Sequence, residues 1–289
     1  MRYAKIQRHA RRFRVQYAMR VFSLVLVGMV ALAVTAGPLP LLAAQTQYQQ
    51  YPQYGSDGPD LRGAVEQIFA LGNQARAQAG VAKLAWDPAL AAAALQHCRR
   101  MAAEGPISHR YGGEPDLTSR AAQAGAHFSV IEENVAVGPS PSAIHQAWMQ
   151  SPGHRENLLN PEVDHVGISV VYSRGVLYAV ADFSTAVQNL SPTQVEARVA
   201  ALIRVSGVSI LSDPKLARSA CTSDDDLLRS PGARPAWMIR WQNSDLSHLP
   251  PDLVNQLQSG KFRQAAIGSC PAQDDGGAFT SYRVAVLLY

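Results

Sequence analysis

The stretch HVGISVVYSRGVLYAVADF, residues 165–183, decides the fold class of this chain. It holds two runs rich in β-branched and aromatic residues, 165–172 and 176–183, joined by Ser173-Arg174-Gly175. This composition, with a short connection that contains glycine, predicts an antiparallel β-hairpin. A purely helical bundle would not contain such a hairpin, so helices elsewhere in the chain must pack against a sheet.

Amphipathic helices are predicted before the hairpin. Residues 60–80 place apolar side chains at the i, i+3, i+4, i+7 spacing of a helix. Residues 87–105 begin with Asp-Pro and end on glycine, which favour a helix start and a helix end. Shorter helices are expected over residues 116–125 and after Ser140. Helices packed on an antiparallel sheet make an α+β fold.

The first 44 residues have the composition of an export signal. They carry seven basic residues and no acidic one, and residues 21–36 are an apolar run. This order predicts a signal peptide that is cleaved after Ala36 or after Ala44. An uncleaved membrane anchor is the alternative, because the apolar stretch through Ala44 is long enough to span a bilayer. Either interpretation makes the folded part secreted, periplasmic or cell-surface. Residues 45–59, rich in glutamine and tyrosine, are expected to be a linker.

The net charge of +4 belongs to this leader alone. The remaining residues hold 19 lysines and arginines against 22 aspartates and glutamates, so the folded part is slightly acidic. Nucleic-acid binding needs clustered basic charge on the folded part. We therefore expect no nucleic-acid partner.

The three cysteines are Cys98, Cys221 and Cys270. Export to an oxidising compartment favours one disulfide and one remaining thiol. Cys221 and Cys270 are the expected pair, because both lie in the last third of the chain. Cys98 lies among alanines in the middle of a predicted helix and is expected to be a buried thiol.

Residues 188–289 partly repeat the plan of residues 60–187. GVAKLAWDPALAAAA, from residue 80, is echoed by GVSILSDPKLARSA, from residue 207. FRQAAIGSC and SYRVAVLLY, from residue 262 onward, loosely echo the closing hairpin. We expect a smaller α+β region there. It is either a degenerate second copy or a region in which helix-start residues recur by chance.

Six of the eight histidines fall between residues 97 and 165. His109 follows the second predicted helix in ISHRYGG, and His154 lies at a helical turn in SPGHRENLLNP. Glu133 stands in IEENVAVG, where an extended run meets a loop of small residues. A glutamate and two histidines from three loops can bind a divalent metal such as zinc, or hold a water molecule. Nothing in their spacing forces the three to meet.

These segments, in this order, resemble a bacterial CAP domain of the SCP-like extracellular family. That family is related to cysteine-rich secretory proteins, antigen 5 and plant pathogenesis-related proteins. The resemblance covers residues 61–187, and its SPGHRENLLNP and ENVA segments are specific. It implies an α-β-α sandwich with a central cleft that carries two histidines and two glutamates.

By motif, the resemblance assigns His109, Glu133 and His154 to this cleft, and His165 is a further candidate for its lining. The second glutamate of the family should lie just after Trp148, but here Trp148 is followed by Met-Gln-Ser-Pro, so that glutamate is absent. The site is therefore short of one carboxylate, and any zinc held by the other three residues would be bound more weakly. The residues expected to be structural neighbours of the cleft are Asn134, Trp148 and Arg155.

Three functions remain open at this point. The resemblance implies a cleft that binds a small hydrophobic or cell-envelope ligand: a lipid, a peptide or a cell-wall fragment. The first alternative is a hydrolase in which His109 and Glu133 act on a bound water. The second is a structural surface protein, whose protein partner the sequence does not reveal. No G-x-S-x-G or H-E-x-x-H motif is present, so a non-enzymatic role is favoured.

Overall fold

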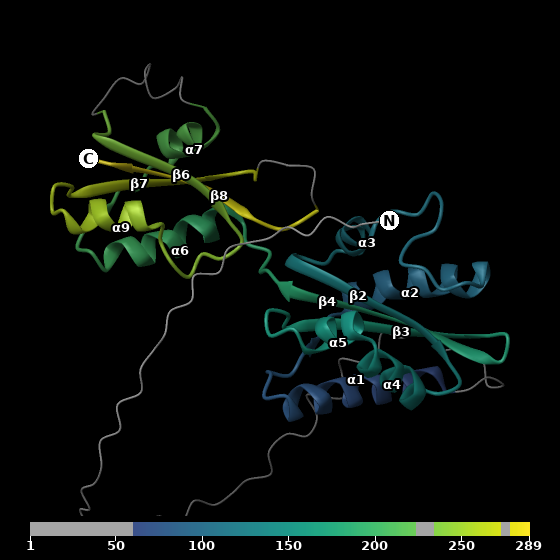
Figure 1. The fold of residues 1–289 in the computed structure, drawn as a ribbon. Helices are drawn as coiled ribbons and strands as arrows, with labels where there is room; N and C mark the ends of the chain where they lie inside the picture. Colours follow the sequence, from purple (N-terminus) through teal and green to yellow (C-terminus); the bar gives the residue numbers. More distant parts are fainter. Residues whose placement is uncertain (1–59, 224–233, 273–277) are drawn as a thin grey trace, which may run out of the picture. The chain divides into compact units, whose positions relative to one another are not determined.

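The computed structural model describes residues 60–223, 234–272 and 278–289. The predicted signal peptide, its cleavage sites and the linker lie outside the described residues (Figure 1). In the part that is described, no helix is both long and apolar enough to cross a membrane. The described chain contains two sheets, each packed against helices of its own, so the predicted α+β class is confirmed.

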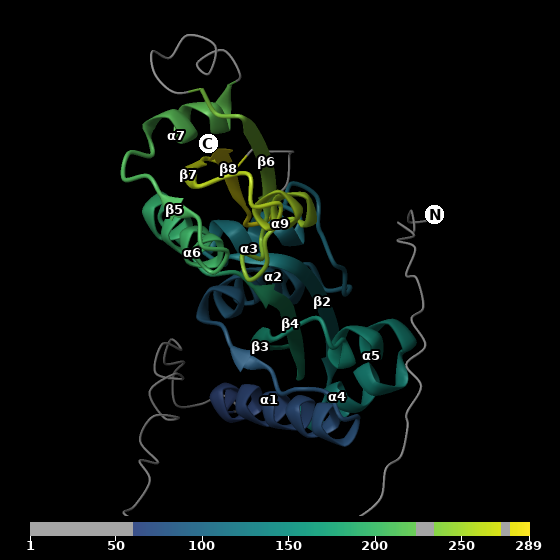
Figure 2. The ribbon, with the colours of Figure 1, turned by 90° about the vertical axis from the view of Figure 1, so that its left-hand side faces the viewer.

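The N-terminal unit, residues 60–187, is a four-stranded sheet between two layers of helices. Its elements are α1 (Leu61–Gln78), β1 (Ala85–Trp86), α2 (Pro88–Glu104), α3 (Leu117–Gln123), β2 (Phe128–Gly138), α4 (Pro141–Gln150), α5 (Pro152–Leu159), β3 (His165–Ser173) and β4 (Val176–Ala186). The strand order is β1-β3-β4-β2. β3 and β4 are the predicted antiparallel hairpin, β2 is antiparallel to β4, and β1 is parallel to β3. α2 and α3 cover one face, and α1, α4 and α5 cover the other (Figures 1 and 2). The implied α-β-α sandwich is confirmed.

Polar caps begin the helices where the sequence predicted them. The side chains of Asp60, Asp87, Asp116 and Ser140 each accept hydrogen bonds from backbone amides of the first turn. These bonds satisfy donors that the start of a helix leaves without partners. At the other end of α2, Gly105 has φ +105°. This backbone conformation favours glycine, so the helix ends and the chain turns into the next loop.

The backbone of α2 lies directly on β3. A Cβ atom on Gly167, in β3, would be 2.0 Å from the amide nitrogen of Ala91 and 2.3 Å from the carbonyl carbon of Leu90. Glycine is therefore required at this position. Two residues further along β3, the hydroxyl of Ser169 donates to the Ala91 carbonyl at 2.9 Å. This contact fixes α2 relative to the sheet.

A buried arginine ties α1 to the turn between α5 and β3. Arg76 is fully buried, and its guanidinium donates four hydrogen bonds to backbone carbonyls. The acceptors are Ala82 at 2.6 Å, Leu158 at 3.0 Å, Asn160 at 2.9 Å and Val163 at 2.9 Å. Arginine suits this role because its five donors form a rigid planar fork. The sequence analysis did not single out Arg76.

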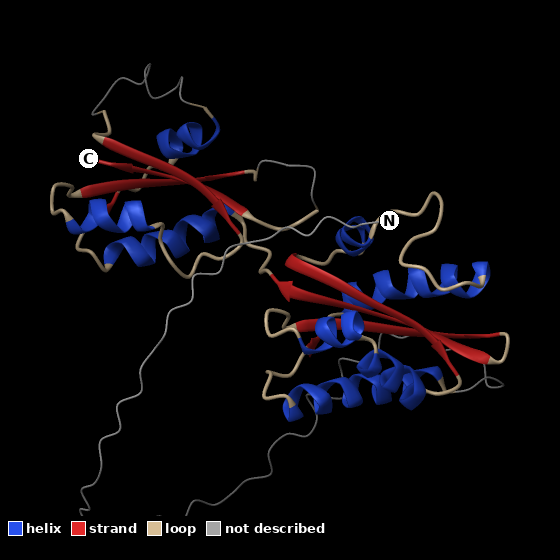
Figure 3. Cartoon of the chain, in the orientation of Figure 1, coloured by secondary structure: helices blue, strands red, loops and turns tan. Residues whose placement is uncertain are grey.

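The C-terminal unit, residues 188–289, has the same plan on a smaller scale. Its elements are α6 (Pro192–Arg204), β5 (Ser209–Ile210), α7 (Lys215–Thr222), β6 (Trp237–Asn243), α9 (Pro251–Gln258), β7 (Gln264–Cys270) and β8 (Tyr282–Leu288). The strand order β5-β7-β8-β6 matches that of the first sheet, with the same parallel and antiparallel pairings. α6 and α9 pack on one face and α7 on the other (Figure 3). The expected smaller α+β region is confirmed.

Equivalent rows of the two sheets correspond residue by residue. In the first sheet Gly167, Asp182 and Glu133 lie side by side across three strands. In the second, the same row holds glycine, alanine and arginine: Gly268, Ala285 and Arg240. A Cβ on Gly268 would be 2.1 Å from the amide nitrogen of Arg218, on α7. Gly268 thus lies against α7 in the same way as Gly167 lies against α2. These correspondences support the second-copy interpretation over chance recurrence. They also show that the two carboxylates of the first row have no counterpart in the second.

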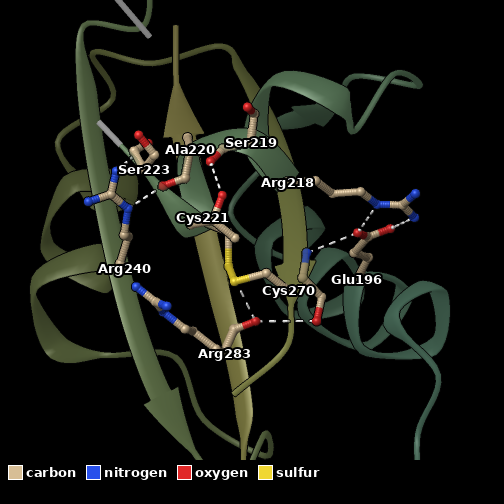
Figure 4. Close-up of a disulfide and its surroundings, with 11 residues drawn as sticks. Glu196, Arg218, Ser219, Ala220, Cys221, Ser223, Arg240, Cys270 and Arg283 are labelled. Carbon is tan, nitrogen blue, oxygen red and sulfur yellow. Dashed lines mark hydrogen bonds and ion pairs between the residues drawn. A yellow bond between two sulfur atoms is a disulfide. The ribbon is translucent and has the colours of Figure 1, made fainter. Parts of the chain in front are cut away.

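The structure joins Cys221, in α7, to Cys270, at the end of β7 (Figure 4). Their Cα atoms are 5.9 Å apart. Close by, Arg240 donates to the carbonyls of Ala220 and Ser223 at the end of α7. Cys98 is a free, buried thiol, and burial raises its pKa to about 12. It is therefore unreactive at neutral pH.

Replacing Gly167 or Gly268 with alanine is expected to destabilise the protein by about 3 kcal/mol, because the new methyl group must push a helix backbone away from the sheet. Gly153→Ala is the control, since nothing lies within 4 Å of a Cβ at that position. Urea unfolding followed by circular dichroism measures all three variants. An unchanged free energy of unfolding for Gly167→Ala would contradict the close approach of α2 to β3.

Arg76→Met should lower the free energy of unfolding by about 3 kcal/mol or more, because several buried carbonyls lose their donors at once. The control is Arg62→Met. Arg62 is exposed and pairs with Glu66 one turn along α1, so its loss is expected to cost less than about 1 kcal/mol. Thermal and urea unfolding compare the two variants. Equal effects would mean that Arg76 does not hold the turn after α5.

Candidate functional site

The structure brings His109, Glu133 and His154 together from three separate elements. His109 lies in the loop between α2 and α3, Glu133 in the middle of β2, and His154 in the first turn of α5. Nδ1 of His109 is 2.8 Å from Oε1 of Glu133, and the ring centroids of His109 and His154 are 6.4 Å apart. The fold thus brings the three residues together, which their spacing in the sequence could not establish.

Glu133 has a second partner that sequence reasoning missed. Its Oε2 atom accepts a hydrogen bond from the guanidinium of Arg120, on α3. Both side chains are buried, with exposed fractions of 3% for Glu133 and 2% for Arg120. A buried carboxylate is tolerated when an opposite charge and hydrogen bonds compensate it, and Arg120 supplies both. In the sequence, the feature that could have drawn attention to Arg120 is its place directly before two alanines in a short predicted helix.

The two histidines differ in exposure. The side chain of His109 is 60% exposed. Its Nδ1 is taken by Glu133, and its Nε2 has no hydrogen-bond partner among the residues described. His154 is partly buried. Burial and then the neighbouring His109 lower the pKa of His154, which keeps its ring uncharged near neutral pH. One oriented imidazole and one neutral imidazole therefore lie side by side.

The neighbours of the site follow the expected roles in part. Asn134 donates to the backbone carbonyl of His154 at 2.8 Å, and the indole of the buried Trp148 donates to Val135 at 3.2 Å. Both brace β2 against the helices beside it, as expected. Arg155 differs: it is exposed, and its side chain has no hydrogen bond or ion pair with the described residues. It lies on the solvent side of the short helix α5, so the structural role expected for it is not seen.

Asn157, on α5, is a bracing residue that sequence reasoning missed. Its amide donates to the Glu133 carbonyl at 3.2 Å and to the side-chain oxygen of Asn134 at 3.0 Å. These bonds connect α5 to the strand that carries the site glutamate. The position of His154 relative to Glu133 therefore depends on two asparagines, both within the segments that resemble the CAP family.

A second carboxyl group lies beside Glu133. Asp182, on β4, is its register partner across the sheet. Asp182 is fully buried, and neither of its carboxyl oxygens has a hydrogen-bond partner among the described residues. Burial, and then the charge of Glu133, raise the pKa of Asp182 well above its ordinary value. It is therefore held as the neutral acid. In the sequence, the feature that could have indicated this buried acid is a single aspartate inside the apolar run of residues 176–183.

His165 does not join the other three residues. It hydrogen-bonds to Asp164 at 2.7 Å, and Asp164 in turn accepts from the amide of Ala186. The register explains the difference, because Gly167, not His165, lies in the same row as Glu133. His165 is two residues further along β3, and β4 separates that strand from β2. The placement of His165 in the cleft is therefore corrected.

The residues as arranged do not fit a bound metal. In the described ranges, no group of three or more His, Cys, Asp or Glu side chains is placed to hold a metal ion. Both oxygens of Glu133 are already engaged, one by His109 and one by the cationic Arg120. A metal ion would have to displace at least one of these partners. The arrangement therefore lends no support to zinc held by His109, Glu133 and His154.

An open hollow of about 770 Å³ lies along α5, on the other side of β2 from Glu133. It is lined by residues of α5 and of the turn after it, and by Glu132. Side chains alternate across a strand, so Glu132 and its neighbour Glu133 face opposite ways. Burial raises the pKa of Glu132, and Asn160 donates to it at 2.9 Å. None of the three predicted cleft residues lines this hollow.

Asp182→Asn tests the state of the buried acid. The raised pKa of Asp182 means that the native protein holds this proton more tightly than the unfolded chain does. The associated stability is present at low pH and is lost as pH rises from the unfolded pKa, about 3.9, through the native one. Asparagine does not ionise. The free energy of unfolding of Asp182→Asn, relative to wild type, should therefore increase as pH rises above about 4.

Asp116→Asn is the control of opposite sign. Hydrogen bonds from the backbone and side chain of Ser119 lower the pKa of Asp116. Its contribution is thus present above the unfolded pKa and lost as pH falls. The relative stability of Asp116→Asn should therefore decrease as pH rises to about 4, the unfolded pKa, and stay flat above it. Urea titrations at a series of pH values measure both variants, and a flat difference for Asp182→Asn would show that Asp182 is not held neutral.

Much of the N-terminal unit matches the model of a known protein family. The model of the cysteine-rich secretory protein family, CAP, matches residues 69–188. Two relatives from Bacillus subtilis are the uncharacterized membrane protein YlbC, 34% identical over 110 residues, and the uncharacterized protein YkwD, 30% identical over 115 residues. The matches cover 36% and 38% of this chain, and 31% and 44% of those relatives. This chain thus spans less than half the length of either relative.

Solved structures of SCP-domain and cysteine-rich secretory proteins are also similar to part of this chain. An extracellular protein containing a SCP domain, from Bacillus anthracis, is 29% identical with a TM-score of 0.41, and the match covers 45% of each chain. A cysteine-rich secretory protein from Staphylococcus aureus is 18% identical with a TM-score of 0.39, covering 47% of this chain and 43% of that one. The family model thus identifies a CAP domain in this chain, over residues 69–188.

Proposed function

We propose that this protein is an exported binding protein whose CAP domain contacts its ligand through His109 and His154. One observation carries the proposal: an exposed imidazole is oriented by a buried carboxylate whose charge Arg120 compensates. Buried ion pairs of this kind are costly to build. Here the pair holds in place a side chain that faces solvent, which is the pattern of a recognition site.

The chemistry of the two rings suits a ligand with both polar and apolar parts. His109 presents Nε2 as an oriented hydrogen-bonding atom, and the partly buried, uncharged His154 adds a flat, weakly polar face beside it. Because His109 is already fixed, binding costs little side-chain entropy. We propose a lipid headgroup, a peptide or a cell-wall fragment as the ligand.

Export is part of the proposal. The basic and apolar leader of residues 1–44 supports it, with cleavage or retention as an anchor as the two alternatives. The disulfide between Cys221 and Cys270 also suits an oxidising compartment. We therefore propose a secreted, periplasmic or cell-surface location.

A hydrolase is the second candidate, and one contact favours it. The 2.8 Å hydrogen bond between Nδ1 of His109 and Glu133 is the arrangement in which a carboxylate orients a general base. Nε2 of His109 could then take a proton from a bound water. The adjacent serine does not serve as nucleophile, because the hydroxyl of Ser108 donates to the carbonyl of Arg110. Hydrolysis would therefore have to proceed through water.

The binding test uses NMR of the exported form labelled with 15N at histidine. Three probes are added separately: muropeptides from peptidoglycan, phosphatidylglycerol vesicles and zinc chloride. We expect muropeptides or vesicles to shift the ring signals of His109 and His154. The signal of His248, an exposed histidine of the C-terminal unit, should stay unchanged. The double variant His109→Ala/His154→Ala should weaken binding by roughly tenfold or more, and His248→Ala is the matched control.

The same samples separate the two candidate functions. If His109 and His248 respond alike, or if the double variant binds as well as wild type, binding at this site is refuted. Mass spectrometry of the muropeptides after incubation shows any hydrolysis. Turnover that falls by about 100-fold or more in Glu133→Gln would favour the hydrolase, and intact muropeptides would remove it.

A further inference from the structure

The loop that carries His109 is not held by regular secondary structure. Residues 105–116 form no helix or strand, yet His109 has a defined position against Glu133. The side chain of His97, on α2, contacts both ends of this loop and is fully buried. Its Nε2 is 2.8 Å from the carbonyl oxygen of Ser108, and its Nδ1 is 2.7 Å from Oε1 of Glu114. Neither the resemblance nor the site chemistry assigns it a role.

The partners of His97 determine where its protons are. A backbone carbonyl can only accept a hydrogen bond, so Nε2 donates to Ser108. Burial alone would raise the pKa of Glu114, but hydrogen bonds from His97 and from the amide of Tyr111 lower it below its ordinary value. Glu114 is therefore a carboxylate, which also only accepts. Both ring nitrogens of His97 thus donate, and the ring is an imidazolium.

The two buried cations of the site act in parallel. His97 pairs with Glu114 and donates to the carbonyl of Ser108. Arg120 pairs with Glu133 and donates to the carbonyl of the next residue, His109, at 3.3 Å. Each cation thus hydrogen-bonds to one buried glutamate and holds one of two consecutive carbonyls. Nε2 of His97 also lies 3.9 Å from Oε2 of Glu133. Hydrogen bonds from charged donors are the stronger ones, so the backbone around His109 is clamped at both positions.

We propose that His97 is a positioning residue, a buried imidazolium that clamps the loop at Ser108 and Glu114 and so sets the position of His109. The proposal rests on the proposed function in one respect, since it concerns the placement of the ligand-contacting His109.

The first test is 15N NMR of the full chain, labelled at histidine, at neutral pH and without ligand. Both ring nitrogens of His97 are expected to carry slowly exchanging protons, because both are buried and hydrogen-bonded. The missing signals of His97→Gln assign them. A single protonated nitrogen on His97 overturns the proposal.

The second test measures how fast the Nδ1 proton of His109 exchanges with solvent. In His97→Ala the loop loses two hydrogen bonds from a charged donor, so exchange should accelerate roughly tenfold or more. His97→Gln, which can still donate to one acceptor, should lie between this variant and wild type. His145→Ala, on α4, is the control. His145 is partly buried and its Nδ1 has no partner in the described part of the chain, so His109 exchange should not change.

Rescue separates clamping from packing. Imidazole added to His97→Ala should enter the vacated space as imidazolium and restore slow exchange at His109, whereas pyrrole, a ring of the same size with one donor, should not. Equal rescue by both compounds, or unchanged exchange in folded His97→Ala, overturns the proposal. If His97→Ala does not fold, His97→Gln and the wild-type spectrum decide. Because no ligand is used, a failure of ligand binding leaves these results unaffected.

Discussion

The backbone of α2 rests on β3 at Gly167, where a Cβ atom would be 2.0 Å from the helix. Most of the first unit depends on this contact. It fixes the distance between α2 and the sheet, and α2 carries His97 at the level of the loop that follows it. The loop in turn carries His109 over Glu133. A side chain larger than hydrogen at residue 167 would move this whole layer away from the strand that holds the site glutamate.

Charge compensation is the second constraint on the site. Two carboxylates, Glu114 and Glu133, are buried here and pair with two cations: His97 lies against both of them, and Arg120 lies against Glu133. The third carboxyl group, Asp182, has no cation to itself and is held neutral by burial and by the neighbouring charge. The buried part of the site is therefore close to electrically balanced. This balance leaves His109 and His154 free to respond to what arrives from solvent.

The C-terminal unit shows how the same scaffold looks without the site. Strand order, pairing and the glycine beneath the helix are retained, but Arg240 and Ala285 occupy the places of Glu133 and Asp182. Arg240 donates to carbonyls at the end of α7, and a disulfide joins that helix to β7. The two units thus share an architecture, but only the first has the buried carboxylates of the site. The geometry of the sheet requires the glycine, whereas the carboxylates serve the site alone.

The sequence by itself determined the local elements and the family. Several features depend only on neighbours along the chain and could therefore be predicted from the sequence. They are the composition of the hairpin, the N-caps at Asp87 and Asp116, and the segments around Glu133 and His154. Only the tertiary structure decided which distant side chains meet. It excluded His165 through the strand register and added Arg120 and Asp182. Burial and cross-strand register arise from packing between elements far apart in the chain, and local sequence patterns carry no record of them.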